Sequence, residues 1–228
     1  MAFLEEIKIP HSNSKNKEFY QCNIAKIIES SPNYLSLKET FECLVDDPYL
    51  QTVARFRKRR YSTCKFINGQ FHWVDSPPAF HQAKFINSYA GGIKRKFKSI
   101  SSQAKIFSEK IIVPILMKYL SKNEAHIGVH QIRITANDDY NGLPAPEGPH
   151  QDGFDFVCTL CIDKRNIAGG NSIVLSEGDI VVNKQLNIGD LLIIDDKHFY
   201  HYVSPIVPLL PGEAHRDMFI FTINCKGN

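Results

Sequence analysis

The chain has 228 residues, of which 43% are hydrophobic and 22% charged, and its formal net charge is +3. These values are typical of a globular protein with a substantial core, and they predict a single domain over residues 1–228. The mild charge argues against a nucleic-acid partner, because proteins that bind nucleic acids usually carry a concentrated basic face.

Targeting signals and cysteine usage both point to the cytoplasm. No apolar run reaches the roughly 18 residues of a membrane span, and the first residues lack the apolar core of a secretory signal. The six cysteines are scattered, and a chain of this length needs no disulfides, so reduced thiols are expected. Cys158 and Cys161 form a CxxC pair, but i and i+3 face opposite ways on a strand, which favours buried thiols over zinc ligands.

Two helical regions are predicted. Within residues 15–50, Ile24, Ile27 and Ile28 recur at helical spacing. The clearest helix spans residues 101–120, where a serine can cap the start and Pro114 should interrupt the backbone hydrogen bonding. Both regions should pack against a core made of strands.

Five of the six residues in the stretch 55–60 are basic. One interpretation is a solvated edge strand, and another is a patch that binds phosphate or nucleic acid. The third interpretation uses strand parity, since Arg57, Arg59 and Tyr61 would share one face. Each of the three remains open at this stage.

Residues 62–92 combine aromatic side chains with turn residues. Phe66 to Val74, around Asn68-Gly69, predicts a β-hairpin. The remainder of this stretch resembles a long loop, and long loops in compact enzymes often act as lids or binding loops.

Short strands separated by glycine and proline turns dominate the rest of the chain. Residues 127–134 alternate, with Gln131 and Arg133 on one face. Helices followed by many short strands predict an α+β protein, mainly β, with an antiparallel jelly-roll barrel at residues 52–75 and 126–225. The further strands are expected at residues 172–175, 179–182, 191–194, 201–205 and 218–223.

The sequence His150-Gln151-Asp152 places an imidazole and a carboxylate two residues apart, so an extended strand would aim both at one point. The third ligand should be a histidine from a distant strand. His198 lies in a turn, whereas His201 opens a new extended stretch, and we favour His201. Two histidines and one carboxylate with open positions are the facial triad of non-haem iron(II) oxygenases.

Arg216 precedes the last apolar strand, fifteen positions after His201. Its guanidinium offers a planar fork of donors that matches a carboxylate in two parallel hydrogen bonds. A dicarboxylate bound to a metal through one end needs such an anchor for the other end.

The ordered set HQDG (150–153), HYVSPI (201–206) and HRDMFIFT (215–222) resembles the iron(II)/2-oxoglutarate-dependent dioxygenases, and within them the free amino-acid hydroxylases of the L-isoleucine 4-hydroxylase type. The resemblance covers residues 50–225. The other matching pieces are RKRRYS (57–62), VDSP (74–77), GGIKRKFKSI (91–100), GVHQIRI (128–134) and IAGGNSIVLS (167–176).

This resemblance implies a double-stranded β-helix and a reaction. Iron(II) would be held by His150, Asp152 and His201, and 2-oxoglutarate would bind Arg216 and reach Gln131. With dioxygen, the products would be succinate, carbon dioxide and a hydroxylated substrate, first of all a free aliphatic or basic L-amino acid. Candidate substrate-binding residues are Arg59, Tyr61, Arg133, Phe154 and Asp155.

Three other classes compete with this prediction. A cupin-like metalloenzyme that does not use 2-oxoglutarate would have no need of Arg216. A protein or nucleic-acid hydroxylase or demethylase would use the basic run at 55–60 as a docking site. A non-catalytic barrel that only binds ligands would have no need of iron.

Overall fold

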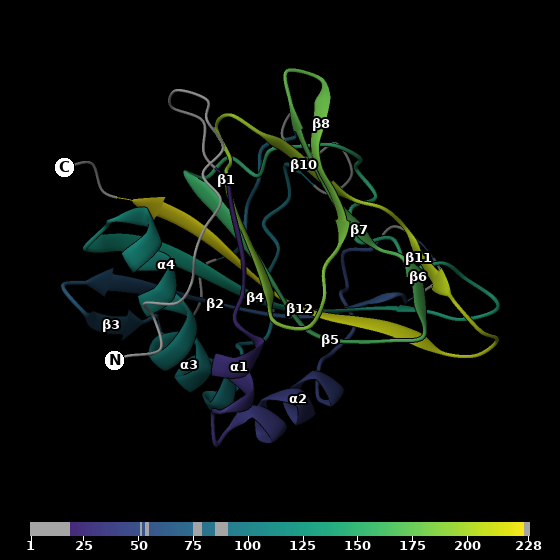
Figure 1. Cartoon of the computed structure of the whole chain (residues 1–228), viewed down its shortest axis with the longest axis horizontal. Coiled ribbons are helices and arrows are strands. Elements are labelled where there is room, and N and C mark those ends of the chain that lie inside the picture. Colours follow the sequence, from purple (N-terminus) through teal and green to yellow (C-terminus); the bar gives the residue numbers. More distant parts are fainter. Residues whose placement is uncertain (1–18, 51, 53–54, 75–78, 85–90, 226–228) are drawn as a thin grey trace.

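A seven-stranded antiparallel sheet forms the larger layer of the computed structural model, which describes residues 19–50, 52, 55–74, 79–84 and 91–225 (Figure 1). A smaller layer lies across from it and contains a three-stranded and a two-stranded sheet. In spatial order the large sheet contains β1 (Phe19–Asn23), β9 (Asp190–Asp195), β5 (Phe156–Arg165), β12 (Ala214–Cys225), β4 (Glu124–Ala136), β2 (Arg57–Ile67) and β3 (Gln70–Trp73). The small sheets contain β10 (Tyr200–Val203), β7 (Asn171–Ser176) and β8 (Asp179–Gln185), and β11 (Ile206–Pro208) and β6 (Ile167–Gly169).

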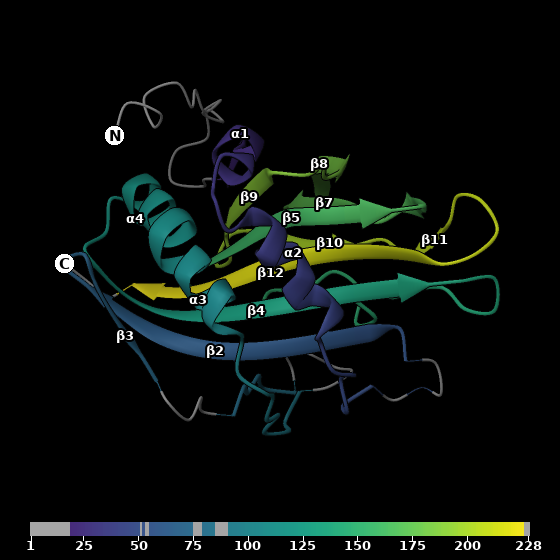
Figure 2. The same ribbon diagram turned by 90° about the horizontal axis from the view of Figure 1, so that it is seen from below.

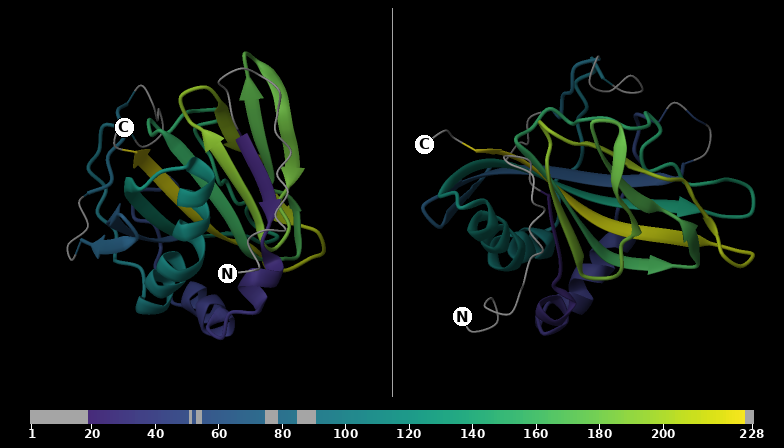
Figure 3. Two further views of the ribbon diagram at one scale, coloured as in Figure 1. Left: turned by 60° about the vertical axis from the view of Figure 1, so that its left-hand side comes forward. Right: turned by 45° about the horizontal axis from the view of Figure 1, so that its top comes forward.

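The helices cover the outer face of the large sheet, as Figure 2 shows for β4 and β12. In Figure 3 they lie on one side of the long strands, and the green strands of the smaller layer lie on the other. This arrangement confirms the predicted jelly-roll core with helices packed on it. The helical segments are α1 (Ala25–Glu29), α2 (Tyr34–Glu42), α3 (Ser102–Phe107), the π-helix η2 (Ser108–Ile112) and α4 (Val113–Leu120).

The helix predicted at 101–120 is present and is interrupted as expected. The hydroxyl of Ser101 caps it by accepting from the Ala104 amide at 3.2 Å. The π-helical turn lies just before Pro114. Proline has no N–H to donate to the carbonyl four residues earlier, so the regular α-helical pattern cannot continue through it.

The prediction that residues 15–50 are helical is correct for α1 and α2 and wrong for Phe19–Asn23, which pairs with β9 as an edge strand. Residues 15–18 lie outside the described part of the chain. The side chains there alternate with period two. Phe19 contacts Phe199 between the layers, whereas Tyr20 packs on the helical side against Tyr119. A strand explains this alternation and a helix does not.

Strand parity divides the apolar side chains into separate cores on the two faces of the large sheet. On β12, Phe219 faces the helices, and its ring centroid lies 5.5 Å from that of Phe41. Its neighbour Met218 belongs to the core between the layers. Cys158 and Cys161 fall in opposite cores in the same way, and all six cysteines are free thiols.

The hairpin predicted around Asn68-Gly69 is confirmed, since β2 and β3 pair with Ile67 opposite Gln70. Both turn residues have positive φ, 48° at Asn68 and 85° at Gly69. A two-residue turn of this kind matches the twist of the strands that it joins.

The basic run at 55–60 is not a solvated edge. Most of it belongs to β2, which pairs with β4 on one side. The segment around Val45 covers the other edge of β2 at this point, since the amide of Arg59 donates to the Val45 carbonyl at 2.8 Å. Arg57 pairs with Asp47, and Arg57 and Arg59 are each only 6% exposed. Arg57 and Arg59 are therefore directed into the protein, whereas Arg55 is exposed and Lys58 and Arg60 are half-buried. Within the described part of the chain, no helix is long and apolar enough to cross a membrane.

Candidate active site

A cavity of about 130 Å³ opens between the two layers, and both polar and apolar side chains line it. Its apolar wall comes from residues such as Ile132 on β4 and Ile220 on β12. Four arginines also face it, namely Arg57, Arg59, Arg95 and Arg216. Arginines with low exposure are a strong sign that the cavity receives anions, because a buried charge is unfavourable without a partner.

His150, Asp152 and His201 meet at one side of this cavity. The Nε2 atoms of His150 and His201 each lie 3.4 Å from an oxygen of the Asp152 carboxylate. The two histidines also exchange backbone hydrogen bonds, with N–O distances of 3.0 Å and 2.8 Å. One ligand atom from each of the three residues lies within 4.8 Å of the others, which is close enough to hold one metal ion.

The prediction placed His150 and Asp152 on a strand, whereas the structure places both residues before the start of β5. Only His150 forms a β-bridge, and β5 does not begin until Phe156. The chain bends at Gly153, which has a φ of 85°. The buried carboxylate of Asp196 holds this bend by accepting from the amides of Asp152, Gly153 and Phe154 at 3.0, 2.7 and 2.9 Å.

Further contacts orient the two imidazoles. His150 Nδ1 lies 2.8 Å from the carbonyl oxygen of Gly148, so it donates there and leaves Nε2 directed at Asp152. His201 Nδ1 lies 3.5 Å from an oxygen of Asp196. Asp196 therefore contacts both the turn that carries one predicted ligand and the ring of another. The sequence analysis did not identify this residue, although it lies only two positions after the predicted strand 191–194.

The electrostatics of the three residues suit a cation. Burial disfavours the charged form of Asp152, yet its contacts with His150 and His201 hold the pKa of this carboxyl well below the ordinary value. Burial likewise opposes protonation of His150, but the neighbouring carboxylates of Asp152 and Glu147 raise its pKa to about 9. An ionised carboxylate with two imidazole nitrogens is a donor set that fits iron(II) with positions left open.

His198 lies outside this group. Its Nδ1 is 2.7 Å from the carboxylate of Asp195, and its side chain is 43% exposed. Of the two histidines that the sequence offered as third ligand, the structure places only His201 beside Asp152.

Gln82 connects the predicted metal ligand Asp152 to Arg95. The amide nitrogen of Gln82 donates to Asp152 Oδ1 at 2.6 Å, and its oxygen accepts from Arg95 at 2.5 Å.

We expect Gln82→Leu to weaken Mn(II) binding by about 10–100-fold, since the Asp152 carboxylate would lose the donor that orients it. Calorimetric titration of the metal-free enzyme measures this effect, with the exposed neighbour His81→Leu as the matched control. Equal Mn(II) affinity in wild type and Gln82→Leu would contradict the positioning role.

Arg216 lies on the cavity face of β12 and is 2% exposed. Its guanidinium contacts the hydroxyl of Ser172 at 3.2 Å, and its Nε has no hydrogen-bond acceptor. Burial lowers the pKa of Arg216. No carboxylate of the described residues forms an ion pair with Arg216. A carboxylate from a bound molecule would supply the missing partner.

Arg59 also faces the cavity, and it brings in His130, which the sequence analysis missed. Arg59 donates to Nδ1 of His130 at 2.6 Å, and its guanidinium carbon lies 5.1 Å from the ring centroid of Phe80. Tyr61 is not part of the cavity lining, and its ring stacks on His130 with centroids 4.4 Å apart. Tyr61 therefore packs against the cavity residue His130 and does not line the cavity itself.

Neither Phe154 nor Asp155 lines the cavity. Phe154 stacks on Phe80 at 6.3 Å and is absent from the cavity lining. The Asp155 carboxylate forms an ion pair with Lys197 and accepts from the amide of Cys225 at 2.7 Å. The prediction that Asp155 binds a substrate ammonium is wrong, because the turn at Gly153 directs it outward.

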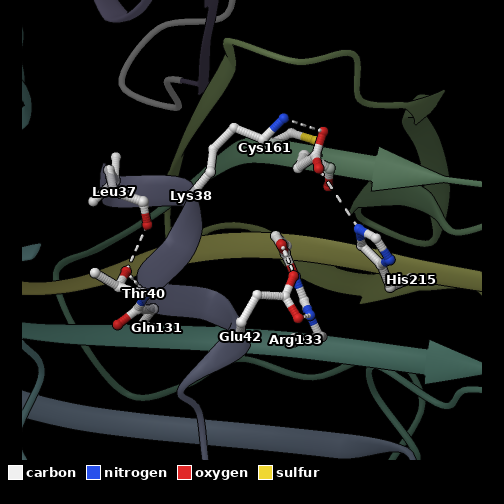
Figure 4. A network of polar contacts seen from close by, with 10 residues as sticks. Leu37, Lys38, Thr40, Glu42, Gln131, Arg133, Cys161 and His215 are labelled. Carbon is white, nitrogen blue, oxygen red and sulfur yellow. Dashed lines mark hydrogen bonds and ion pairs between the residues drawn. The ribbon is translucent and has the colours of Figure 1, made fainter. Parts of the chain in front are cut away.

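Gln131 and Arg133 lie on the opposite face of β4 from the cavity, so the predictions that they bind co-substrate or substrate are wrong. Figure 4 shows both side chains directed at α2. Arg133 pairs with Glu42 and Asp217 at 2.7 Å and 2.6 Å, and Gln131 donates to the Thr40 hydroxyl at 2.6 Å. The two residues share a face, as predicted, but this face attaches a helix to the sheet.

A second cluster on the same outer face contains Asp163, His215 and Asp217. Its carboxylates already have cationic partners, since Lys38 lies 3.2 Å from Asp163 and Arg133 lies 2.6 Å from Asp217 (Figure 4). Their charges are compensated within the protein, so this cluster is a helix–sheet contact and not a second metal centre.

The fold and the site together define a jelly-roll protein with two histidines and one carboxylate at one side of an arginine-rich cavity. A family model described as 2OG-Fe dioxygenase matches residues 38–222, and the chain belongs to this family. It is therefore an oxygenase that uses iron(II), 2-oxoglutarate and dioxygen, as the sequence analysis predicted. This family membership excludes the alternatives of a metalloenzyme without 2-oxoglutarate and of a non-catalytic barrel.

Solved structures share this fold. A BsmA homologue from Methylobium petroleophilum PM1 is 22% identical with a TM-score of 0.75, covering 93% of this chain and 90% of the homologue. IDO from Bacillus thuringiensis is 20% identical with a TM-score of 0.72, covering 92% of this chain and 95% of IDO. The Fe(II)/α-ketoglutarate-dependent dioxygenase TqaL is 16% identical with a TM-score of 0.63, covering 87% of this chain and 77% of TqaL. A search of curated proteins finds no match.

Proposed function

We propose that this oxygenase hydroxylates an unactivated C–H bond of a free L-amino acid, the reaction type of the L-isoleucine 4-hydroxylase group that its motifs resemble. In the balanced reaction one atom of dioxygen enters the substrate as hydroxyl and the other enters succinate, while 2-oxoglutarate loses carbon dioxide. The observation that carries this proposal is Arg59, a buried guanidinium that faces the cavity without a carboxylate partner among the described residues.

The roles of the chain's own residues follow from their positions. His150, Asp152 and His201 would hold iron(II), which together with 2-oxoglutarate and dioxygen supplies the oxidising chemistry. Arg216 would bind the distal carboxylate of 2-oxoglutarate, and Arg59 the carboxylate of the substrate. The apolar wall that includes Ile132 and Ile220 would exclude water from the reacting carbon.

The composition of the cavity narrows the choice of amino acid. Four arginines face it, so a basic side chain would bring another positive charge among them. This disfavours the basic amino acids that the sequence analysis had included.

We also propose a cytoplasmic location, which the six free thiols support.

The test is to incubate the iron-loaded enzyme with 2-oxoglutarate and each of a panel of L-amino acids. We expect at least one of them to increase succinate formation and to gain the mass of one oxygen atom. Background turnover of 2-oxoglutarate that no amino acid stimulates would contradict the proposal, and the family assignment would still stand.

A further inference from the structure

A group of hydrogen-bond donors lies around Phe80, in the part of the cavity where Arg59, Arg95 and His130 meet. The guanidinium carbons of Arg59 and Arg95 lie 5.1 Å and 4.8 Å from the centroid of the Phe80 ring. The ring of His130 lies 4.8 Å from the same centroid. All three residues line the cavity, and we call this group the Phe80 cluster.

Each of the three residues has a buried nitrogen without a hydrogen-bond partner. These atoms are Nε of Arg59, Nε of Arg95 and Nε2 of His130. Because Arg59 donates to Nδ1 of His130, the proton of this neutral imidazole is on Nε2, which is then a donor as well. Burial, followed by the charge of Arg59, holds the pKa of His130 well below its ordinary value. A site with three unpaired donors is complementary to a group that only accepts, such as a carboxylate.

The Phe80 cluster is separate from the anchor of the co-substrate. Arg216 lies on β12, whereas Arg59 lies on β2 and His130 on β4. Arg95 lies outside these strands and forms an isolated β-bridge with Phe80. The backbone amide of Phe80 donates to the carbonyl oxygen of Arg95 at 2.8 Å, and the backbone amide of Arg95 donates to the carbonyl oxygen of Phe80 at 2.9 Å. Gln82 binds both Arg95 and Asp152, so the cluster extends toward the metal ligands.

The cavity keeps a net positive charge when iron(II) and 2-oxoglutarate are bound. Asp47 neutralises Arg57, and the distal carboxylate of 2-oxoglutarate would neutralise Arg216. Iron(II) balances Asp152 and the metal-binding carboxylate of 2-oxoglutarate. Among the described residues that line the cavity, Arg59 and Arg95 then remain against Glu147, which leaves an excess of one positive charge.

From these observations we propose that the substrate is an acidic amino acid, whose second carboxylate is bound by the Phe80 cluster. This inference rests on the proposed function and names its substrate class. A neutral amino acid is a zwitterion and leaves the excess charge in place, whereas one additional carboxylate cancels it. Within the cluster, Arg59 would bind the α-carboxylate, and Arg95 and His130 would bind the side-chain carboxylate.

Matched pairs of substrates test the proposal. We expect kcat/KM to be about 100-fold higher for glutamate than for glutamine, or for aspartate than for asparagine. The side-chain amide carries no negative charge, and its NH2 group would face the N–H donors of the cluster. The assay measures succinate formed by the iron-loaded enzyme with each amino acid. Calorimetry with the Mn(II)–2-oxoglutarate complex, which does not turn over, measures the affinity for each amino acid directly.

Variants then assign the effect to the cluster. Arg95→Gln should reduce the acid-to-amide preference by at least about 10-fold in both assays. Lys96→Gln removes the same charge from an exposed neighbour and is the matched control. His130→Phe, which removes another unpaired donor of the cluster, should act in the same direction, so the result does not depend on one variant folding.

The outcomes separate this inference from the function on which it rests. If neutral amino acids are hydroxylated as well as acidic ones, or if Arg95→Gln leaves the acid-to-amide ratio unchanged, the inference is wrong and amino-acid hydroxylation stands. If no amino acid of either kind stimulates succinate formation, the proposed function fails, and the acidic substrate fails with it.

Discussion

Replacing His150 or Asp152 with alanine is expected to abolish 2-oxoglutarate turnover, with a loss of more than about 100-fold, and to leave the fold intact. Each variant removes one of three donors that lie around one point. Neither side chain belongs to the apolar cores, and the turn that carries them is held through the backbone amides of residues 152–154. Succinate formation and circular dichroism measure the two parts of this prediction, and retained turnover in either variant would refute the ligand assignment.

The two candidate histidines supply a matched control. His201→Ala should be as inactive as His150→Ala, whereas His198→Ala should keep most of the activity, because His198 contacts Asp195 at the surface. Titration with Mn(II) should show lost binding for His201→Ala alone. The opposite order would mean that the chain uses the other histidine, and that the orientation of His201 toward Asp152 has no role in metal binding.

The second large effect is expected from Arg216→Ala, which should raise the KM for 2-oxoglutarate by roughly 100-fold or more. Truncating one partner of a buried, charged hydrogen-bonded pair costs about 2–5 kcal/mol, and each 1.4 kcal/mol is a factor of ten. Arg216 is buried on the cavity face, where its guanidinium contacts the hydroxyl of Ser172 at 3.2 Å. Steady-state kinetics over a range of 2-oxoglutarate concentrations measure this change.

Two comparisons make the Arg216 result specific. Arg216→Lys should recover part of the affinity, since it restores the charge and loses the planar fork of donors. Mn(II) binding should be unchanged in both variants, because Arg216 is not among the metal-ligand candidates. A KM for 2-oxoglutarate that changes by less than about threefold would place the co-substrate carboxylate elsewhere, with Arg59 and Arg95 as the remaining cavity arginines that lack a carboxylate partner.

Much of the architecture followed from local patterns. Short apolar runs bounded by turn residues were sufficient for the strands around residues 172–223, and turn residues were sufficient for the Asn68-Gly69 hairpin. Helical spacing with a serine cap was sufficient for the helix before Pro114. These signals act over a few residues, so they can be recognised without knowing what packs against the segment.

Strand parity succeeded at one level and failed at another. It grouped Gln131 with Arg133 correctly, but it could not say which face of β4 would meet the cavity. Since α2 covers the face that carries these two, the cavity received their neighbours His130 and Ile132. A shift of one residue exchanges the two faces of a strand, and only the packing of other elements selects between them.

The chain alone therefore determined which residue types could perform this chemistry and the order in which they occur: a histidine and a carboxylate, a later histidine, and a final arginine. The tertiary structure decided how they meet. Asp196 holds the bend at Gly153 from 43 residues away, and the Phe80–Arg95 bridge brings a further arginine to the cavity. Contacts between such distant segments depend on the packing of the whole barrel, and no local pattern in the sequence encodes them.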